Sequence, residues 1–134
     1  MEYISEKKKR IIYWVFTIWL ALGMTAGGVQ QLFQIGGYVE IVSQLGYPLY
    51  LLSILGFWKI LGVVAILIPG FPLVKEWAYA GFFFAMSGAA ASHFIAGDSF
   101  SEAIPSLVLL ILTVISWYFR PAGRTVVSVH QKEE

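Results

Sequence analysis

Residues 49–68 read LYLLSILGFWKILGVVAILI, an apolar stretch with one charged side chain, Lys59, near its middle. Its length lies within the roughly 17–25 residues that a helix needs to cross the hydrocarbon core of a bilayer. Three further apolar runs of similar length occur at residues 11–33, 77–96 and 103–119. We therefore predict an all-α integral membrane four-helix bundle, with one spanning helix for each run.

The distribution of positive charge predicts how the bundle is oriented. Apart from Lys59, every Lys and Arg lies outside the apolar runs, at Lys7, Lys8, Lys9, Arg10, Lys75, Arg120, Arg124 and Lys132. If all four runs cross the membrane, these positions share one side, and the opposite connections contain no Lys or Arg. The positive-inside rule then places both termini in the cytoplasm, with residues 120–134 as a cytoplasmic tail.

The N-terminal basic segment and the run after it also imitate a secretory signal. The run is longer than a typical signal core and has no clear small-x-small cleavage site, so we expect it to be retained as the first helix. A single transmembrane domain over residues 1–134 fits a chain that is 58% hydrophobic and 13% charged.

Composition excludes several function classes. Basic residues cluster only at the start of the chain, so we expect no nucleic-acid partner. The chain contains no cysteine, which removes thiol redox chemistry, iron–sulfur ligation and thiolate zinc sites. His93 and His130 are the two histidines, and His130 lies in the hydrophilic tail, so a bis-histidine haem within one protomer is not expected. We predict no metal site and no intrinsic cofactor.

The connection at residues 34–48 carries its own helical pattern. Its apolar residues recur at i, i+3, i+4 and i+7, at Tyr38, Ile41, Val42 and Leu45. Gly46 and Pro48 then supply a stop signal. We predict a short amphipathic surface helix between the first two spanning helices, lying on the outer face of the membrane.

Small residues predict where the spanning helices approach one another. The first run contains a G-x3-G step, Gly23 and Gly27, and the third contains a stripe formed by Gly81, Ala85, Gly88 and Ser92. Small side chains allow close helix packing in lipid. We expect the stripe in the third run to pack against the first or second spanning helix.

Lys59 is the leading candidate for a functional residue. At 1.5 Å per residue it lies about 15 Å from either end of its run, farther than snorkelling reaches, so its ammonium is expected to point into the bundle. Other polar side chains at similar depth or nearer the outer face complete a predicted ligand-binding set: Thr25, Ser87, Gln30, Gln31 and His93, with Glu76 and Asp98 in second rank. The set outlines a pocket for a lipophilic molecule with polar head atoms, such as a quinone.

A structural interpretation of these residues stays open. Lys59 can donate to backbone carbonyls near Gly56 or Gly62, and a histidine near the outer interface is often a helix-end residue. Glu76 falls in the first turn of its helix, where a carboxylate complements the helix dipole.

Several short motifs together resemble the DoxX-like family of small four-helix membrane proteins. They are Leu45-Gly46-Tyr47-Pro48, Lys59-x-x-Gly62, Pro69-x-Phe71-Pro72, the stretch KEWAYAGF at 75–82, Gly88-Ala89-x-x-Ser92-His93 and Gly97-Asp98. The resemblance covers roughly residues 10–121. It implies a bacterial inner-membrane protein and a link to membrane oxidoreductases, since some members are tied to thiosulfate:quinone oxidoreduction and relatives to maturation of membrane or periplasmic proteins.

Three functions are compatible with these observations. The first is a quinone-associated accessory subunit of a membrane oxidoreductase system, rather than a self-sufficient enzyme. The second is a non-enzymatic assembly factor that contacts a membrane or periplasmic partner protein, or a second copy of the chain. The third is a small transporter, which ranks last because no Asp or Glu lies at mid-depth for proton coupling.

Overall fold

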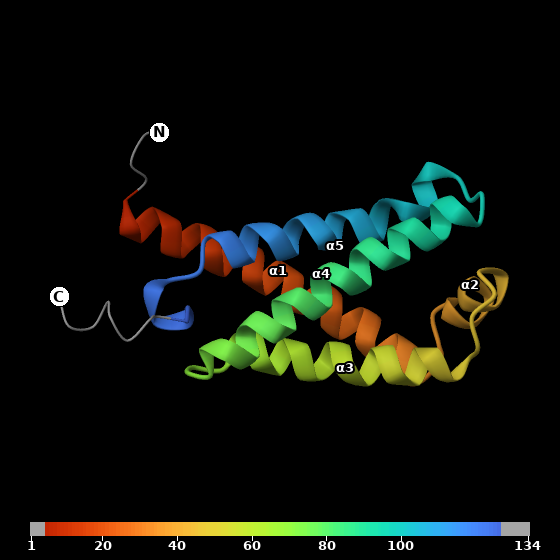
Figure 1. Cartoon of the computed structure of the whole chain (residues 1–134), viewed down its shortest axis with the longest axis horizontal. Coiled ribbons are helices and arrows are strands. Elements are labelled where there is room, and N and C mark those ends of the chain that lie inside the picture. The colour runs from red at the N-terminus through yellow and green to blue at the C-terminus, as the bar shows by residue number, and fades with distance from the viewer. Residues whose placement is uncertain (1–4, 127–134) are drawn as a thin grey trace.

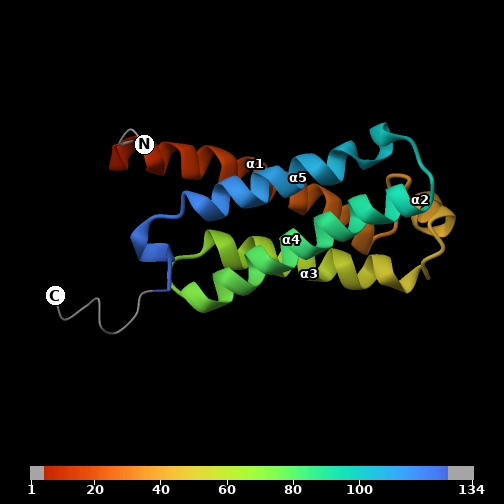
Figure 2. The same ribbon diagram turned by 45° about the horizontal axis from the view of Figure 1, so that its top comes forward.

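The computed structural model describes residues 5–126 and is all-α in that range. Its helices are α1 (Glu6–Leu32), α2 (Tyr38–Gln44), α3 (Tyr50–Leu67), α4 (Pro72–Ile95) and α5 (Phe100–Tyr118), followed by a 3₁₀ turn, η1 (Ala122–Arg124). The predicted fold class is confirmed, including the short helix between the first two long ones. Figures 1 and 2 show the four long helices side by side, with α2 folded over one end of the bundle.

Three helices are long and apolar enough to cross a membrane: α1, α3 and α5. Helix α4 has 24 residues but a less apolar composition, rich in Ala, Gly and aromatic residues. It connects the end of α3 to the start of α5 and packs along both, so it runs through the same layer. The chain is therefore a multi-pass membrane protein in contact with the lipid bilayer.

Three helices, α1, α4 and α5, begin before the apolar runs predicted for them. Helix α1 starts at Glu6, because the Ser5 hydroxyl accepts a hydrogen bond from the backbone N–H of Lys8 at 3.2 Å and caps the helix. Helix α4 starts at Pro72, which suits the first helical turn. The apolar runs predict the part of each helix that lipid can surround, whereas caps set where the backbone hydrogen bonds begin.

The described cations other than Lys59 gather at one end of the bundle, which we call the basic end. This end carries the start of α1, the α3–α4 turn and the chain after α5, whereas the α2 end carries α2 and the α4–α5 turn (Figure 1). Lys132 and His130 lie outside the described residues. The Lys and Arg residues that the sequence places outside the apolar runs thus lie together at one end of the bundle, as far as the structure describes them.

Helices α1 and α3 touch through their backbones. A β-carbon on Gly56 would lie 2.5 Å from the carbonyl oxygen of Gly28 and 2.6 Å from the backbone nitrogen of Leu32, closer than any side chain tolerates. Gly23 and Gly27, where the sequence predicted close packing of helices, lie against side chains instead. Gly23 makes room for Leu109 of α5, and Gly27 faces the side chains of Tyr38 and Lys59. Close approach of the first two spanning helices therefore depends on Gly28 and Gly56.

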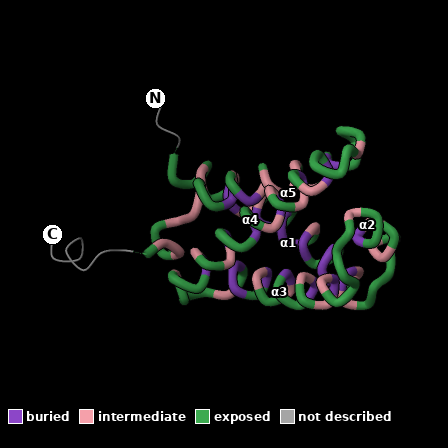
Figure 3. The backbone as a smooth tube through the Cα atoms, turned by 45° about the vertical axis from the view of Figure 1, so that its right-hand side comes forward, coloured by how far each residue is buried: buried purple, intermediate pink, exposed green. Residues whose placement is uncertain are grey.

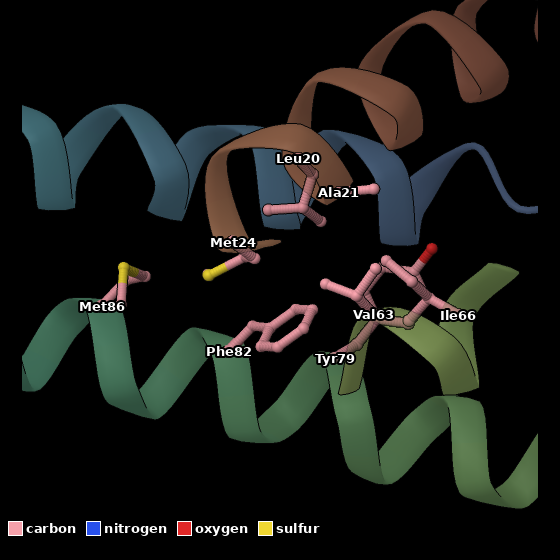
Figure 4. Close-up of a cluster of buried hydrophobic side chains, with 8 residues drawn as sticks. All are labelled: Leu20, Ala21, Met24, Val63, Ile66, Tyr79, Phe82 and Met86. Carbon is pink, nitrogen blue, oxygen red and sulfur yellow. The ribbon is translucent and has the colours of Figure 1, made fainter. Parts of the chain in front are cut away.

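The core lies where α1, α3 and α4 meet, toward the basic end. Figure 4 shows its eight buried side chains: Leu20, Ala21, Met24, Val63, Ile66, Tyr79, Phe82 and Met86. Helix α5 adds partly buried leucines from its side. Figure 3 shows buried positions along the inner sides of the helices and exposed positions on their outer sides. Many of the exposed residues are large and apolar, as suits a surface that faces lipid.

The prediction that the stripe of small residues in α4 packs against α1 or α3 is wrong. Gly81 and Gly88 are exposed, and a β-carbon on either would meet nothing within 4 Å. Helix α4 instead turns its larger side chains inward, among them Tyr79, Phe82 and Met86. These fill the space between three helices, which small residues would leave as a cavity.

Candidate functional site

Lys59 lies inside the bundle, at the junction of α1, α2 and α3. It is 7% exposed, and its side chain reaches across to the Gly27 position of α1. A β-carbon at Gly27 would lie 3.8 Å from the Lys59 ammonium nitrogen, Nζ, and 3.4 Å from the phenol oxygen of Tyr38. Within residues 5–126, no hydrogen bond or ion pair involves this ammonium. An ammonium at this depth calls for an acceptor, whether a water molecule, a protein group or a ligand.

Tyr38 is a member of this site that the sequence analysis did not assign. The pattern in residues 34–48 placed it on the apolar face of a short helix, and α2 folds so that this face covers the end of α1 and α3. Burial raises the pKa of the Tyr38 phenol above its ordinary value, which keeps it a hydrogen-bond donor at neutral pH. The signal available in the sequence was a hydroxyl on an otherwise apolar face.

Gln31 adds an amide to the same face of α1. It lies one turn beyond Gly27, is 6% exposed, and its side-chain oxygen has no hydrogen-bond partner among the described residues. Gln30, its neighbour, points elsewhere and packs its amide against Gly36 in the turn before α2. Of the two predicted glutamines, the structure therefore brings Gln31 to the face of α1 that carries the Lys59 contact.

The hydroxyls predicted at the depth of Lys59 lie away from it. Thr25 is exposed, two residues before Gly27 and therefore on the other side of α1. Ser87 is half-buried and donates to the carbonyl of Phe84 in its own helix, at 3.3 Å. Any role of these two residues in binding stays a prediction.

His93 and Asp98 pair with each other at the α2 end. The His93 ring nitrogen Nδ1 lies 2.7 Å from an Asp98 carboxylate oxygen, and the Asp98 N–H donates to the His93 carbonyl at 3.0 Å. His93 is 8% exposed. Nearby, the Tyr47 phenol bonds the Ser92 hydroxyl at 2.6 Å and ties the α2–α3 connection to α4. These contacts close the α4–α5 turn, and no hydrogen bond or ion pair joins His93 to Lys59 in the described part of the chain.

Two further cations at the basic end hold the last carbonyls of α3. Lys75, 1% exposed, donates to the carbonyls of Ala65, at 2.7 Å, and Ile68. Arg124 donates to the carbonyls of Ile66 at 2.9 Å and Leu67 at 3.3 Å, and its guanidinium stacks over the Trp14 ring. The end of a helix leaves such carbonyls without partners, so both cations have a structural role. The sequence had marked both only as topology signals.

Glu76 belongs to a second cluster at this end. Its carboxylate forms an ion pair with Arg120 and accepts a hydrogen bond from the Trp117 indole at 3.1 Å. The Arg120 guanidinium in turn lies 4.9 Å from the centre of the Trp117 ring. Glu76 therefore joins α4 to the end of α5, far along the bundle from Lys59.

A buried hydroxyl network lies close to this cluster, in the half of the bundle toward the basic end. Ser116 of α5 bonds the hydroxyls of Thr17, at 2.6 Å, and Tyr79, at 2.7 Å. All three residues are buried, and they come from α5, α1 and α4. Every hydroxyl has a hydrogen-bond partner, so we interpret the network as a structural link between the three helices rather than a binding site. The sequence analysis found no site in α5 and assigned no role to Ser116 or Thr17.

The described residues contain no cluster of His, Cys, Asp and Glu that could hold a metal ion. What the Lys59 site offers is two donors, the ammonium and the phenol, and an amide with an unpartnered oxygen on the same face. A ligand with acceptor oxygens and an apolar body fits the two donors, whereas the Gln31 oxygen needs a donor from the ligand or from water. Among residues 5–126, no hydrogen bond or ion pair joins a carboxylate or a histidine to the Lys59 ammonium.

A comparison with protein families gives one match. The model of the DoxX-like family matches residues 15–116, which include Lys59, Tyr38, Gln31, His93 and Glu76. No curated protein and no solved structure matches the chain.

Proposed function

Because this chain belongs to the DoxX-like family and buries a lysine without a partner, we propose that it binds a lipophilic molecule with polar head atoms. A quinone is the candidate, with its carbonyl oxygens at Lys59 and Tyr38. In this proposal the protein is an accessory subunit of a membrane oxidoreductase system and exchanges electrons only through a partner protein. The observation that carries the proposal is the Lys59 ammonium, which faces Gly27 and has no hydrogen-bond partner among the described residues.

The charge at the site supports an acceptor-bearing ligand. An ammonium at the centre of a bundle is unfavourable unless something accepts its hydrogen bonds. The phenol of Tyr38 lies beside it, and Gln31 presents an unpartnered amide oxygen one turn away. A ligand oxygen between Nζ and the phenol would accept from both donors and remove this cost.

Gly27 provides a sharp test. Gly27→Ala leaves every polar group in place but puts a methyl group into the space between them, at ordinary contact distance from both. Native mass spectrometry of the gently purified protein, followed by lipid extraction, measures the bound ligand. We expect wild type to retain a quinone or related molecule, and both Gly27→Ala and Lys59→Met to lose it.

Thr25→Ala is the matched control, because Thr25 is a polar residue at neighbouring depth that faces outward. It should retain the ligand. A protein that carries no ligand in any form, or a ligand that survives both Gly27→Ala and Lys59→Met at equal folded yield, would contradict the proposal.

The location proposed with this function is a bacterial inner membrane with the basic end in the cytoplasm. The absence of cysteine makes the orientation easy to test, since Ser5→Cys and Ser99→Cys each introduce a single thiol at opposite ends. A membrane-impermeant maleimide added to intact cells whose outer membrane has been permeabilised should label the Ser99→Cys protein alone. Labelling of the Ser5→Cys protein alone would reverse the orientation.

A second candidate is an assembly factor for another membrane or periplasmic protein, or a homodimer. The exposed Gly81 and Gly88 favour it, since they leave a surface of α4 open to close approach by another helix. Gly88→Leu should release a co-purified partner if this function is correct, whereas an unchanged partner content would exclude this surface.

A further inference from the structure

A groove runs between α4 and α5 on the lipid side of the bundle. It has a volume of about 350 Å³, and its lining residues are Glu76, Tyr79, Ala80, Phe83, Phe84, Thr113, Val114 and Trp117. From Glu76 to Phe84 it extends about 12 Å along α4 at 1.5 Å per residue. The walls are apolar, and the charged side chain among the lining residues lies at the basic end.

The basic end of the groove is lined by the Glu76 carboxylate, and Arg120, which is not a lining residue, lies beside that carboxylate. The Glu76 carboxylate and the Arg120 guanidinium form an ion pair, with side chains 30% and 13% exposed. Arg120 also donates from Nε to the Trp117 carbonyl at 2.6 Å and stacks on the Trp117 ring. Trp117 is held in turn by its bond to Glu76. The three side chains fix one another, so the end of the groove is preorganised for a ligand.

These charges discriminate between headgroups. A carboxylate has about four acceptor positions, and Glu76 uses some of them for Trp117 and Arg120, which leaves room for a further donor. A primary ammonium can donate there, while the adjacent phosphate meets the guanidinium of Arg120. A quaternary ammonium has no hydrogen to donate, and a phosphoglycerol headgroup offers Glu76 only neutral hydroxyls, which form weaker hydrogen bonds to a carboxylate than a primary ammonium does.

We propose that this groove holds an acyl chain of a phospholipid whose headgroup combines a phosphate with a primary ammonium. The chain lies against Tyr79, Ala80, Phe83 and Val114, and the headgroup lies at Glu76 and Arg120. The site is separate from Lys59, which faces α1 and α2. The test of this lipid site is therefore independent of the function proposed for the Lys59 site.

The test measures lipid retention by the full chain in nanodiscs. The discs contain equal amounts of phosphoethanolamine, phosphocholine and phosphoglycerol lipids with identical acyl chains. After release into detergent, native mass spectrometry counts the lipids that stay bound. We expect one phosphoethanolamine lipid per chain, retained about fivefold over each competitor, the effect of one net hydrogen bond. Equal retention of the three lipids would overturn the proposal, as would a protein dimer without lipid.

Two variants locate the bound lipid. Ala80→Trp fills the groove and should abolish retention of every lipid, whereas Ala91→Trp adds the same bulk at an exposed position of α4 outside the groove and should not. Glu76→Gln should keep the acyl chain but lose the preference for the primary ammonium. Unchanged retention in Ala80→Trp would overturn the proposal. If that variant does not fold, Val114→Phe fills the groove from α5, and the headgroup preference of wild type tests the proposal without any variant.

Discussion

Lys59 and Lys75 are both buried lysines, and the difference between them separates the two ends of the molecule. At the basic end, Lys75 donates to two backbone carbonyls, and Arg124 serves the carbonyls beside them. Toward the α2 end, Lys59 is nearly as buried but faces a phenol and Gly27 and has no acceptor among the described residues. A buried cation that donates to backbone carbonyls holds the fold together, whereas one without an acceptor in the protein is available to a ligand.

The largest loss of stability should come from replacing Lys75, the lysine whose ammonium donates to backbone carbonyls. Lys75→Met leaves the carbonyl of Ala65 buried without its donor and leaves the carbonyl of Ile68 with Arg124 alone, and we expect a loss of about 3 kcal/mol in the free energy of unfolding. Equilibrium unfolding in mixed detergent micelles measures it. Lys8→Met, at an exposed position near the start of α1, is the control and should change little. A stable Lys75→Met protein would show that the basic end does not depend on this capping.

An intermediate loss of stability is expected when an uncharged side chain that has hydrogen-bond partners is removed. Ser116→Ala removes the shared partner of the Thr17 and Tyr79 hydroxyls, which stay buried. The cost should be about 1–2 kcal/mol, measured in the same unfolding experiment. Thr25→Ala removes an exposed hydroxyl of α1 and should be nearly neutral. Equal effects of the two changes would mean that the network contributes nothing beyond its packing.

The smallest effect on stability should come from replacing Lys59, the lysine without an acceptor among the described residues. Lys59→Met replaces a buried charge by an apolar side chain of similar length, and the ligand-free protein should stay within about 1 kcal/mol of wild type or become more stable. Ligand binding should be lost in the same variant. A destabilisation as large as that of Lys75→Met would place Lys59 with the structural cations and remove the contrast between the two ends.

The sequence predicted the fold class well, because length and apolar composition are properties of each segment alone. The run at 49–68 with its single lysine and the amphipathic pattern of residues 34–48 both correspond to helices, α3 and α2. The orientation of α4 was not predictable in the same way. Its small and large residues both form continuous faces, and which face turns inward depends on the volume left by α1, α3 and α5.

The candidate site was predicted in part. Lys59 and Gln31 follow from polarity within an apolar run, and the structure places both on the inner side of the bundle. Tyr38 could not be assigned, since its hydroxyl reaches Gly27 only once α2 folds over the ends of α1 and α3. The ion-pair partner of Arg120, Glu76, and the carbonyl partners of Arg124 were equally hidden. They lie more than 40 positions away along the chain, and the sequence offers no local pattern that joins them.

The contact between Gly28 and Gly56 has a consequence for how much change this protein tolerates. Since α1 and α3 meet through main-chain atoms, their register is fixed without any side chain between them. The height of Lys59 opposite Gly27 is then a property of the backbone, and substitutions among the leucines and methionines of the core leave it unaltered. Related chains can therefore differ widely in their interior and still present the same ammonium at the same depth.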